Sequence, residues 1–370
     1  MDMKKKYFLL AAAFFVGAVV LFSVFSVFFK TIAPKNESKN FNAGIAVNKN
    51  FENNSANLAL EEKNEQLVKI LAFGDLMLDR NVFSLAKKNN NFEYPFLKID
   101  DFLKGADIRL ANLEGPVTEF DSVAVGTSKL QFTFSLKFME ALEKRFEVFS
   151  LANNHSLDFG EKGLSQAKEF LSKAKIIFFG DYKNRKEYLS AIIEKNDIKI
   201  GLVGLNSLVV KDDSEALAEI ANLKAKSDFV IVMPHWGNEY QLKPTASQKN
   251  SGHRFIDAGA DLVLGGHPHV IEPIEIYKEK VIFHSLGNFI FDQYFSQETM
   301  RGLSVGISIS KKHNEVAASY ELYPLEINKQ SQASLASLEI TRKILEELSQ
   351  EIEADGNIKE DIKKGFISSP

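Results

Sequence analysis

Two patterns of apolar residues alternate along the chain. Beyond residue 67, short runs of consecutive apolar residues are separated by segments in which apolar residues recur every three or four positions, as in 161–173 and 247–258. The first pattern is typical of buried strands and the second of amphipathic helices. Their alternation predicts an α/β domain with largely parallel strands. The predicted strands are residues 68–73, 108–111, 148–152, 176–179, 198–205, 229–233, 262–264 and 281–284.

Toward the C-terminus the pattern changes. Residues 303–310 and 315–323 form two strand-like runs around a polar turn at 311–314. This arrangement predicts a hairpin that closes one sheet. Residues 334–352 place apolar residues at helical spacing among many charges, which predicts a surface helix followed by a frayed end.

The N-terminal residues carry a membrane signal. Three lysines at positions 4–6 precede an uncharged, apolar stretch at 7–29. At about 1.5 Å rise per residue this stretch spans roughly the 30 Å hydrocarbon core, so we expect an uncleaved transmembrane anchor. Under the positive-inside rule the lysines stay cytoplasmic and the rest of the chain is extracytoplasmic, as in a single-pass protein of the cell membrane. A cleaved signal peptide is the competing interpretation, but its apolar core would run only about 7–15 residues.

These signals divide the chain into five segments. The polar, Asn-rich stretch after the anchor has too few apolar residues to form a core, which predicts a flexible tether. The predicted segments are a cytoplasmic tail at 1–6, the anchor at 7–29, the tether at 30–66, a globular domain at 67–330, and a C-terminal helix and tail at 331–370.

Composition narrows the classes of function. The 370 residues have a net charge of −4, and no long run of Lys or Arg occurs, which argues against nucleic-acid binding. The sequence contains no cysteine, so disulfides, thiolate metal sites and cysteine nucleophiles are excluded. No Gly-rich Lys-Ser/Thr phosphate loop is present, so ATP-driven polymer synthesis would require a partner synthetase.

Polar clusters follow five of the predicted strands, at the edge of an open α/β sheet where ligand sites form. Together they contain four of the seven histidines in the chain. Taken singly, each has a structural interpretation, such as a helix cap for Asp75, a surface position for Glu114, a turn for Asn154 and a semi-buried histidine for His235. The pair His267 and His269 is the most specific feature. The clusters are 73–77, 111–115, 152–155, 234–240 and 265–269.

The donor groups in these clusters suit a divalent metal ion. One set drawn from them, with two carboxylates, one amide and three of the four imidazoles, offers mixed oxygen and nitrogen donors that favour Zn²⁺, Mn²⁺ or Fe. We expect Glu239 and Tyr240 to contact substrate in the same pocket, with Trp236 either beside them or in the core. Asn288 is expected next to the site, shaping a loop or contacting substrate. Ser285 lacks a nucleophile-elbow motif, which argues against a serine hydrolase.

Six motifs occur in a fixed order, and in that order they resemble the capsule-synthesis (CapA-type, poly-γ-glutamate) family over about residues 68–325. That family is similar to calcineurin-like metallophosphoesterases. The resemblance implies a four-layer α/β/β/α sandwich and a membrane-anchored role in synthesis or export of capsule polymer. The motifs are residues 74–80, 112–114, 153–160, 235–240, 259–269 and 285–289.

The resemblance also implies roles for individual residues. His155 would take the place of the histidine that contacts the scissile group, and Glu114 the place of the carboxylate that bridges two metal ions. Metallophosphoesterases carry Asp-x-His after the first strand, whereas this chain has Asp75-Leu76-Met77. A thioether is a poor ligand for a hard cation, which predicts a weakened or lost metal position. The implied metal ligands are Asp75, Glu114, Asn154, His235, His267 and His269.

Two hypotheses from different classes follow. In the first, the protein is a metal-dependent hydrolase, phosphoesterase-like or acting on a γ-glutamyl polymer, with His155 as the acid or anion-stabilising group. In the second, it is a non-catalytic scaffold that holds or exports an anionic capsule or envelope polymer within a membrane complex. The altered motif at Met77 favours the second hypothesis, and metal content together with turnover would separate the two.

Overall fold

The computed structural model describes residues 66–313 and 315–368. The chain divides into two units, Met1–Leu58 and Ala59–Pro370, and all described residues belong to the second. The predicted anchor and most of the tether therefore lie outside the described residues. Among residues 66–313 and 315–368, no helix is both long enough and apolar enough to cross a membrane.

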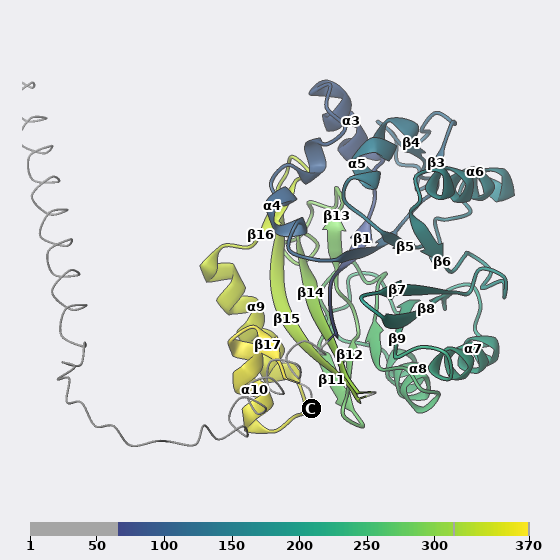
Figure 1. Cartoon of the computed structure of the whole chain (residues 1–370). Coiled ribbons are helices and arrows are strands. Elements are labelled where there is room, and N and C mark those ends of the chain that lie inside the picture. Colours follow the sequence, from purple (N-terminus) through teal and green to yellow (C-terminus); the bar gives the residue numbers. More distant parts are fainter. Residues whose placement is uncertain (1–65, 314, 369–370) are drawn as a thin grey trace, which may run out of the picture. The chain divides into compact units, whose positions relative to one another are not determined.

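The larger of two main β-sheets runs through the centre of the domain (Figure 1). Its strand order is β16-β15-β14-β1-β2-β5-β6, with β13 beside β1 and β17 beside β15. Strands β1, β2, β5 and β6 are parallel, whereas β14, β15 and β16 are antiparallel neighbours. The strands are β1 (Gln66–Leu76), β2 (Ile108–Leu113), β5 (Val148–Ser150), β6 (Ile177–Phe179), β13 (Asn288–Ile290), β14 (Arg301–Lys312), β15 (Glu315–Ile327), β16 (Ala333–Leu335) and β17 (Phe366–Ile367).

The smaller sheet has the order β11-β12-β10-β9-β8-β7. Its four inner strands are parallel and its two edge strands are antiparallel. Two short strands, β3 (Val117–Thr118) and β4 (Phe134–Ser135), form a separate pair. The strands of the smaller sheet are β7 (Ser190–Lys195), β8 (Ile198–Asn206), β9 (Phe229–His235), β10 (Leu262–Leu264), β11 (Ile274–Tyr277) and β12 (Lys280–Phe283).

Three apolar cores define the layers. The largest joins the inner faces of both sheets, through residues such as Ile70 of β1 and Ile231 of β9. A second core packs α3 to α6 on the outer face of the larger sheet, and a third packs α7 and α8 on the outer face of the smaller one. The helices are α3 (Arg80–Lys88), α4 (Asp100–Leu103), α5 (Met139–Glu143), α6 (Gly160–Lys173), α7 (Ser214–Lys224), α8 (Ala246–Asp257), α9 (Leu338–Glu351) and α10 (Gly356–Lys363), with 3₁₀ turns η1 (Tyr94–Phe96) and η2 (Leu136–Phe138).

The mixed α/β fold predicted from hydrophobic periodicity is confirmed. All eight predicted strands are present, β10 with the predicted ends and the other seven with shifted ends. The predicted hairpin is β14–β15, but it does not close the sheet, because β16 and β17 pair with β15. The prediction of a frayed end after residue 352 is wrong. Helix α10 and strand β17 follow α9, and the buried side chains of Ile362 and Ile367 join the inner core.

Candidate metal centre

Three buried side chains from different strands meet at one edge of the two sheets. Asp75 lies at the end of β1, Glu114 directly follows β2, and His235 ends β9. Each offers a ligand atom, and these three atoms lie within 4.8 Å of one another. All three side chains are at most 2% exposed. The sheets therefore place two carboxylates and an imidazole around one enclosed point, which we call the enclosed cluster.

Close backbone packing positions Asp75. Its N–H donates a hydrogen bond to the Gly287 carbonyl at 3.0 Å, in the loop that leads into β13. The preceding residue, Gly74, comes so near that a Cβ would lie 1.9 Å from the same carbonyl oxygen. A Cβ on Gly266 would lie 2.8 Å from Asp75 Oδ1. Glycine is therefore required at 74, and a side chain at 266 would press on the carboxylate.

Asparagine side chains support the enclosed cluster. Asn112 Nδ2 donates to Asp75 Oδ1 at 2.8 Å, and Asn153 Nδ2 donates to Asn112 Oδ1 at 2.9 Å. Asn154, a predicted ligand, lies with its Oδ1 2.8 Å from His235 Nε2. The predicted ligand Asn154 is thus at the cluster, while Asn112 and Asn153 orient its members. Both residues belong to the sequence motifs, but their residue types alone do not distinguish a supporting role from a turn.

A second group of potential ligands lies at the mouth of the site. Glu239, His267 and His269 offer ligand atoms within 4.8 Å of one another, and we call them the mouth cluster. His269 joins the two clusters, because its Nε2 is 3.6 Å from Glu114 Oε1 and its Nδ1 is 3.2 Å from Asp75 Oδ2. All six predicted metal ligands therefore lie at one place in the fold.

Burial and mutual charge set the protonation states. Burial raises the pKa of Glu114 well above its ordinary value, and the Asp75 charge adds to this effect. Burial opposes ionisation of Asp75, but a hydrogen bond from His269 and the nearby imidazoles hold its pKa below the ordinary value. Burial also lowers the pKa of His235 and His267, that of His267 to about 4. Against burial, the Glu114 and Asp75 carboxylates raise the pKa of His269 to about 9.

The donor set fits a divalent cation. Two buried ligand atoms, Glu114 Oε1 and His267 Nδ1, have no hydrogen-bond partner within residues 66–313 and 315–368. An unpaired buried polar atom is costly, and a cation beside it removes that cost. Neutral imidazoles at His235 and His267 present the lone pairs that a metal requires. Carboxylate and imidazole donors together suit Zn²⁺, Mn²⁺ or Fe²⁺.

An open cleft of about 500 Å³ lies over the mouth cluster, and its lining includes His155, Glu239, Tyr240 and His269. His155 Nδ1 is 2.8 Å from Asp158 Oδ2, and the His155 ring stacks on Phe132 with centroids 4.2 Å apart. Asp158 Oδ2 also accepts a hydrogen bond from the Phe132 N–H at 2.7 Å. The imidazole of His155 is therefore held in a fixed orientation at the cleft wall.

Two residues for which substrate contact was one of two alternatives are buried. Trp236 is buried in the core of the smaller sheet, where it stacks on Phe255 and its Nε1 donates to the His284 carbonyl at 2.8 Å. Asn288 is fully buried, and its Oδ1 lies 3.0 Å from His269 Nδ1. Trp236 thus takes the core position that the sequence left open, and Asn288 lies next to the site as expected, while neither residue lines the cleft. Trp236 satisfies its indole N–H within the core, and Asn288 orients a predicted metal ligand.

Two further histidines form a cluster that the sequence did not indicate. His253 lies with its Nε2 2.5 Å from Glu275 Oε1, and its ring stacks on Tyr277. His284 Nε2 is 2.9 Å from the other Glu275 oxygen. Because these residues are far apart in sequence, only the pairing of β11 with β12 and the packing of α8 bring them together.

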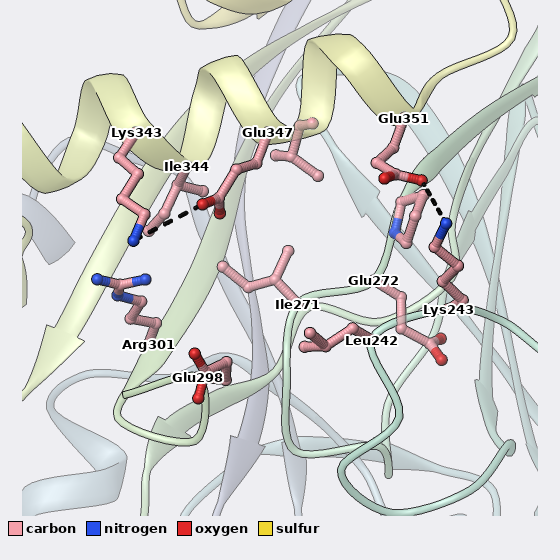
Figure 2. A pocket seen from close by; sticks show the side chains of 12 residues that line it. Leu242, Lys243, Ile271, Glu272, Glu298, Arg301, Lys343, Ile344, Glu347 and Glu351 are labelled. Atoms are coloured by element: carbon pink, nitrogen blue, oxygen red, sulfur yellow. Dashed lines mark ion pairs between the residues drawn. The ribbon is translucent and has the colours of Figure 1, made fainter. Parts of the chain in front are cut away.

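A separate cavity of about 260 Å³ lies beneath α9 (Figure 2). Ile271 and Leu242 form part of its apolar floor, and two ion pairs line its rim. Lys243 Nζ is 3.2 Å from Glu351 Oε2, and Lys343 Nζ is 3.8 Å from Glu347 Oε1. None of the predicted metal ligands lines this cavity, so it is distinct from the metal centre.

Fold and site together define an α/β protein with a candidate metal centre of carboxylates and imidazoles. The sequence model described as "Bacterial capsule synthesis protein PGA_cap" matches residues 69–293, and the chain belongs to this family.

Individual proteins that resemble this chain share less than 30% of its sequence in the two comparisons that follow. The chain is similar to the capsule biosynthesis protein CapA of Bacillus anthracis, with 29% identity over 62% of this chain and 61% of that protein. It is also similar to the PGA biosynthesis protein CapA of Bacillus subtilis (strain 168), with 28% identity over 80% of each chain. Among solved structures, a putative 5'-nucleotidase from Staphylococcus aureus has a TM-score of 0.42 and 13% identity, over 80% of this chain and 57% of that one.

Proposed function

We propose that this protein is a membrane-anchored, extracytoplasmic component of capsule polymer synthesis or export, and that its metal centre supports hydrolysis. The enclosed cluster carries the proposal. Its three residues have ligand atoms within 4.8 Å of one another, and the buried Glu114 Oε1 has no hydrogen-bond partner within the described residues, a cost that a bound cation removes. The relatives' names, which refer to capsule and PGA biosynthesis, support poly-γ-glutamate as the polymer.

The arrangement of layers supports a metallophosphoesterase-type sandwich. Two sheets lie face to face between outer helices, and the candidate ligands come from the carboxyl ends of strands in both sheets. Such edges are where open α/β sheets form ligand sites. A divalent cation there would supply Lewis-acid polarisation of a carbonyl or phosphoryl oxygen.

His155 is the proposed acid or anion-stabilising group. It faces the open cleft beside His269 and Glu239, so it can contact a bound ester, amide or phosphoryl group. The Asp158 carboxylate orients the ring through Nδ1, which leaves Nε2 for substrate. This geometry lets Nε2 donate a proton to a leaving group or a hydrogen bond to developing negative charge.

Membrane anchoring and a partner enzyme complete the proposal. The apolar stretch at 7–29 behind three lysines supports a single-pass anchor with the domain outside the cytoplasm. The sequence contains no phosphate-binding Gly-rich loop, so a separate synthetase would drive polymerisation.

Turnover by the purified full-length chain tests the proposal. The assay uses a generic phosphodiester and γ-glutamyl peptides with Mn²⁺, Zn²⁺ or Fe²⁺ added. We expect metal-dependent hydrolysis that falls by about 100-fold or more in the His155→Ala variant, because general acid catalysis contributes about that much. His313→Ala is the matched control, since His313 is exposed and outside the cleft lining. Full activity in His155→Ala, with unchanged folding, would refute the catalytic role.

A second candidate function is a polymer-holding scaffold without turnover. One observation favours it: Met77 is fully buried in the outer core of the larger sheet, and its sulfur accepts the Asp79 N–H at 3.0 Å. This side chain therefore contributes no donor to the metal centre. Binding of poly-γ-glutamate by the wild-type chain, with no hydrolysis under any of the three metals, would establish this function instead.

A further inference from the structure

The mouth cluster differs from the enclosed cluster in its residues and its exposure. Glu239, His267 and His269 include none of the residues of the enclosed cluster, yet their ligand atoms are grouped just as closely. The Glu239 side chain is exposed, whereas those of His267 and His269 are buried. The sequence predicts a substrate contact for Glu239, but its carboxylate lies beside two imidazoles at the entrance to the site.

The backbone holds Glu239 in this place. Tyr240, in the left-handed region with φ of 63°, donates its N–H to the Pro268 carbonyl at 2.8 Å. Its ring stacks on His269, with centroids 6.1 Å apart. Gly237 also has a positive φ, and a Cβ there would lie 2.7 Å from the Gln248 side-chain amide. The loop that carries Glu239 is thus fastened to the turn that carries both histidines.

The imidazoles of His267 and His269 are positioned to bind a cation. His267 is 7% exposed, and its Nδ1 is buried without a hydrogen-bond partner among the described parts of the chain. His269 Nδ1 lies 3.0 Å from Asn288 Oδ1, which orients the ring, and its Nε2 lies 3.6 Å from Glu114 Oε1. An unpartnered buried nitrogen beside a second oriented imidazole and a carboxylate is a set of donors suited to a borderline divalent cation.

We propose that Glu239 is a metal ligand, and that with His267 and His269 it holds a second divalent cation at the mouth of the cleft. This inference rests on the proposed function of the enclosed cluster as a metal site. The mouth cluster has one carboxylate and an exposed member, whereas the enclosed cluster has two carboxylates and no exposed member. The ion in the mouth cluster therefore binds more weakly than the ion in the enclosed cluster and exchanges faster with solvent. Occupancy of both clusters at once then depends on the metal concentration outside the protein.

Metal stoichiometry of the full-length chain in detergent tests this inference. The chain is stripped with chelator and equilibrated against a Mn²⁺ series, and bound Mn²⁺ per chain is measured by mass spectrometry. We expect the wild type to bind two ions with separate affinities. Glu239→Gln should keep the tighter ion and weaken the other by at least about tenfold. Glu298→Gln is the matched control, because Glu298 is an exposed carboxylate lining the separate cavity of Figure 2.

The outcomes distinguish this inference from the proposed function. Two ions with unchanged affinities in Glu239→Gln would overturn the role of Glu239 and leave the enclosed site intact. Loss of both ions in Glu239→Gln would also overturn the inference, because the two clusters would then not be separate metal sites. A wild-type chain that binds no ion would overturn the proposed function itself. Because Glu239 is exposed, its replacement should leave the unfolding temperature unchanged, which confirms that the variant is folded.

Discussion

Replacing Glu272 with glutamine should make the fold more stable at pH 8 but not at pH 4. Glu272 lines the cavity beneath α9 (Figure 2) and is 1% exposed. Gln248 Nε2 donates to its Oε2 at 2.6 Å, while Oε1 has no partner within the described residues. Burial, only partly offset by that hydrogen bond, raises the pKa of Glu272 from 4.5 to about 7.

The sign and size follow from proton linkage. Between pH 4.5 and 7 the unfolded chain has released the Glu272 proton while the folded chain still holds it. The free energy of unfolding therefore falls as pH rises through this window. Each pKa unit corresponds to about 1.4 kcal/mol, and the pKa of Glu272 rises from 4.5 to about 7 on folding. Across this window the free energy of unfolding of the wild type therefore falls by about 3 kcal/mol through Glu272, and that of the glutamine variant does not. All other titrating groups are common to both chains, so the difference between them isolates Glu272.

Urea unfolding of the Ala59–Pro370 unit, followed by circular dichroism from pH 4 to pH 8, measures this difference. We expect the advantage of Glu272→Gln over wild type to grow by about 3 kcal/mol across the range. Glu298→Gln, at an exposed carboxylate with a lowered pKa on the same cavity, should show less than about 0.5 kcal/mol of such growth. A pH-independent difference for Glu272→Gln, or one of opposite sign, would show that the pKa of Glu272 is not raised in the folded protein.

Two further predictions concern the metal centre. Because the carboxylates raise the pKa of His269 to about 9, a cation in the mouth cluster must displace its proton. The Mn²⁺ affinity of the mouth cluster should therefore rise about tenfold per pH unit between about pH 6 and 9 and then level off. Mn²⁺ titrations at several pH values check this, and a flat profile for the weaker ion would contradict it. Gly74→Ala should destabilise the fold by at least about 2 kcal/mol, because its Cβ would lie 1.9 Å from the Gly287 carbonyl oxygen. Gly105→Ala, with its nearest contact at 3.4 Å, is the control in urea unfolding, and equal losses in both variants would count against the packing argument.

Periodicity located the strands that build the site but missed several others. The apolar runs that became β1, β2, β8, β9 and β10 are long or strongly hydrophobic, because both of their faces are buried. Strand β7 at the edge of the smaller sheet mixes exposed and buried residues, so its pattern resembles a loop. The short strands β16 and β17 exist only through pairing with β15, which is a tertiary contact without a local signal.

At the candidate metal centre, residue type and position after a strand were enough to predict which side chains lie together. The parallel strands of each sheet end at the same edge, which the alternation of elements already implies. The six predicted ligands meet because the two sheets also pack face to face, which the alternation does not imply. Orientation was not predictable in the same way. Trp236 and Glu239 lie three residues apart in one motif, yet one packs into the core and the other faces the cleft. That difference depends on the positive φ of Gly237 and on the Tyr240 contact with Pro268.

Asp75, Glu114 and His235 are proposed to hold a divalent cation. Crystals of the protein grown with Mn²⁺, with diffraction recorded on both sides of the Mn absorption edge, show whether an ion binds there. We expect an anomalous peak between these three side chains, where their ligand atoms come within 4.8 Å of one another. Well-ordered side chains with no anomalous density between them, in crystals soaked at millimolar Mn²⁺, would contradict it.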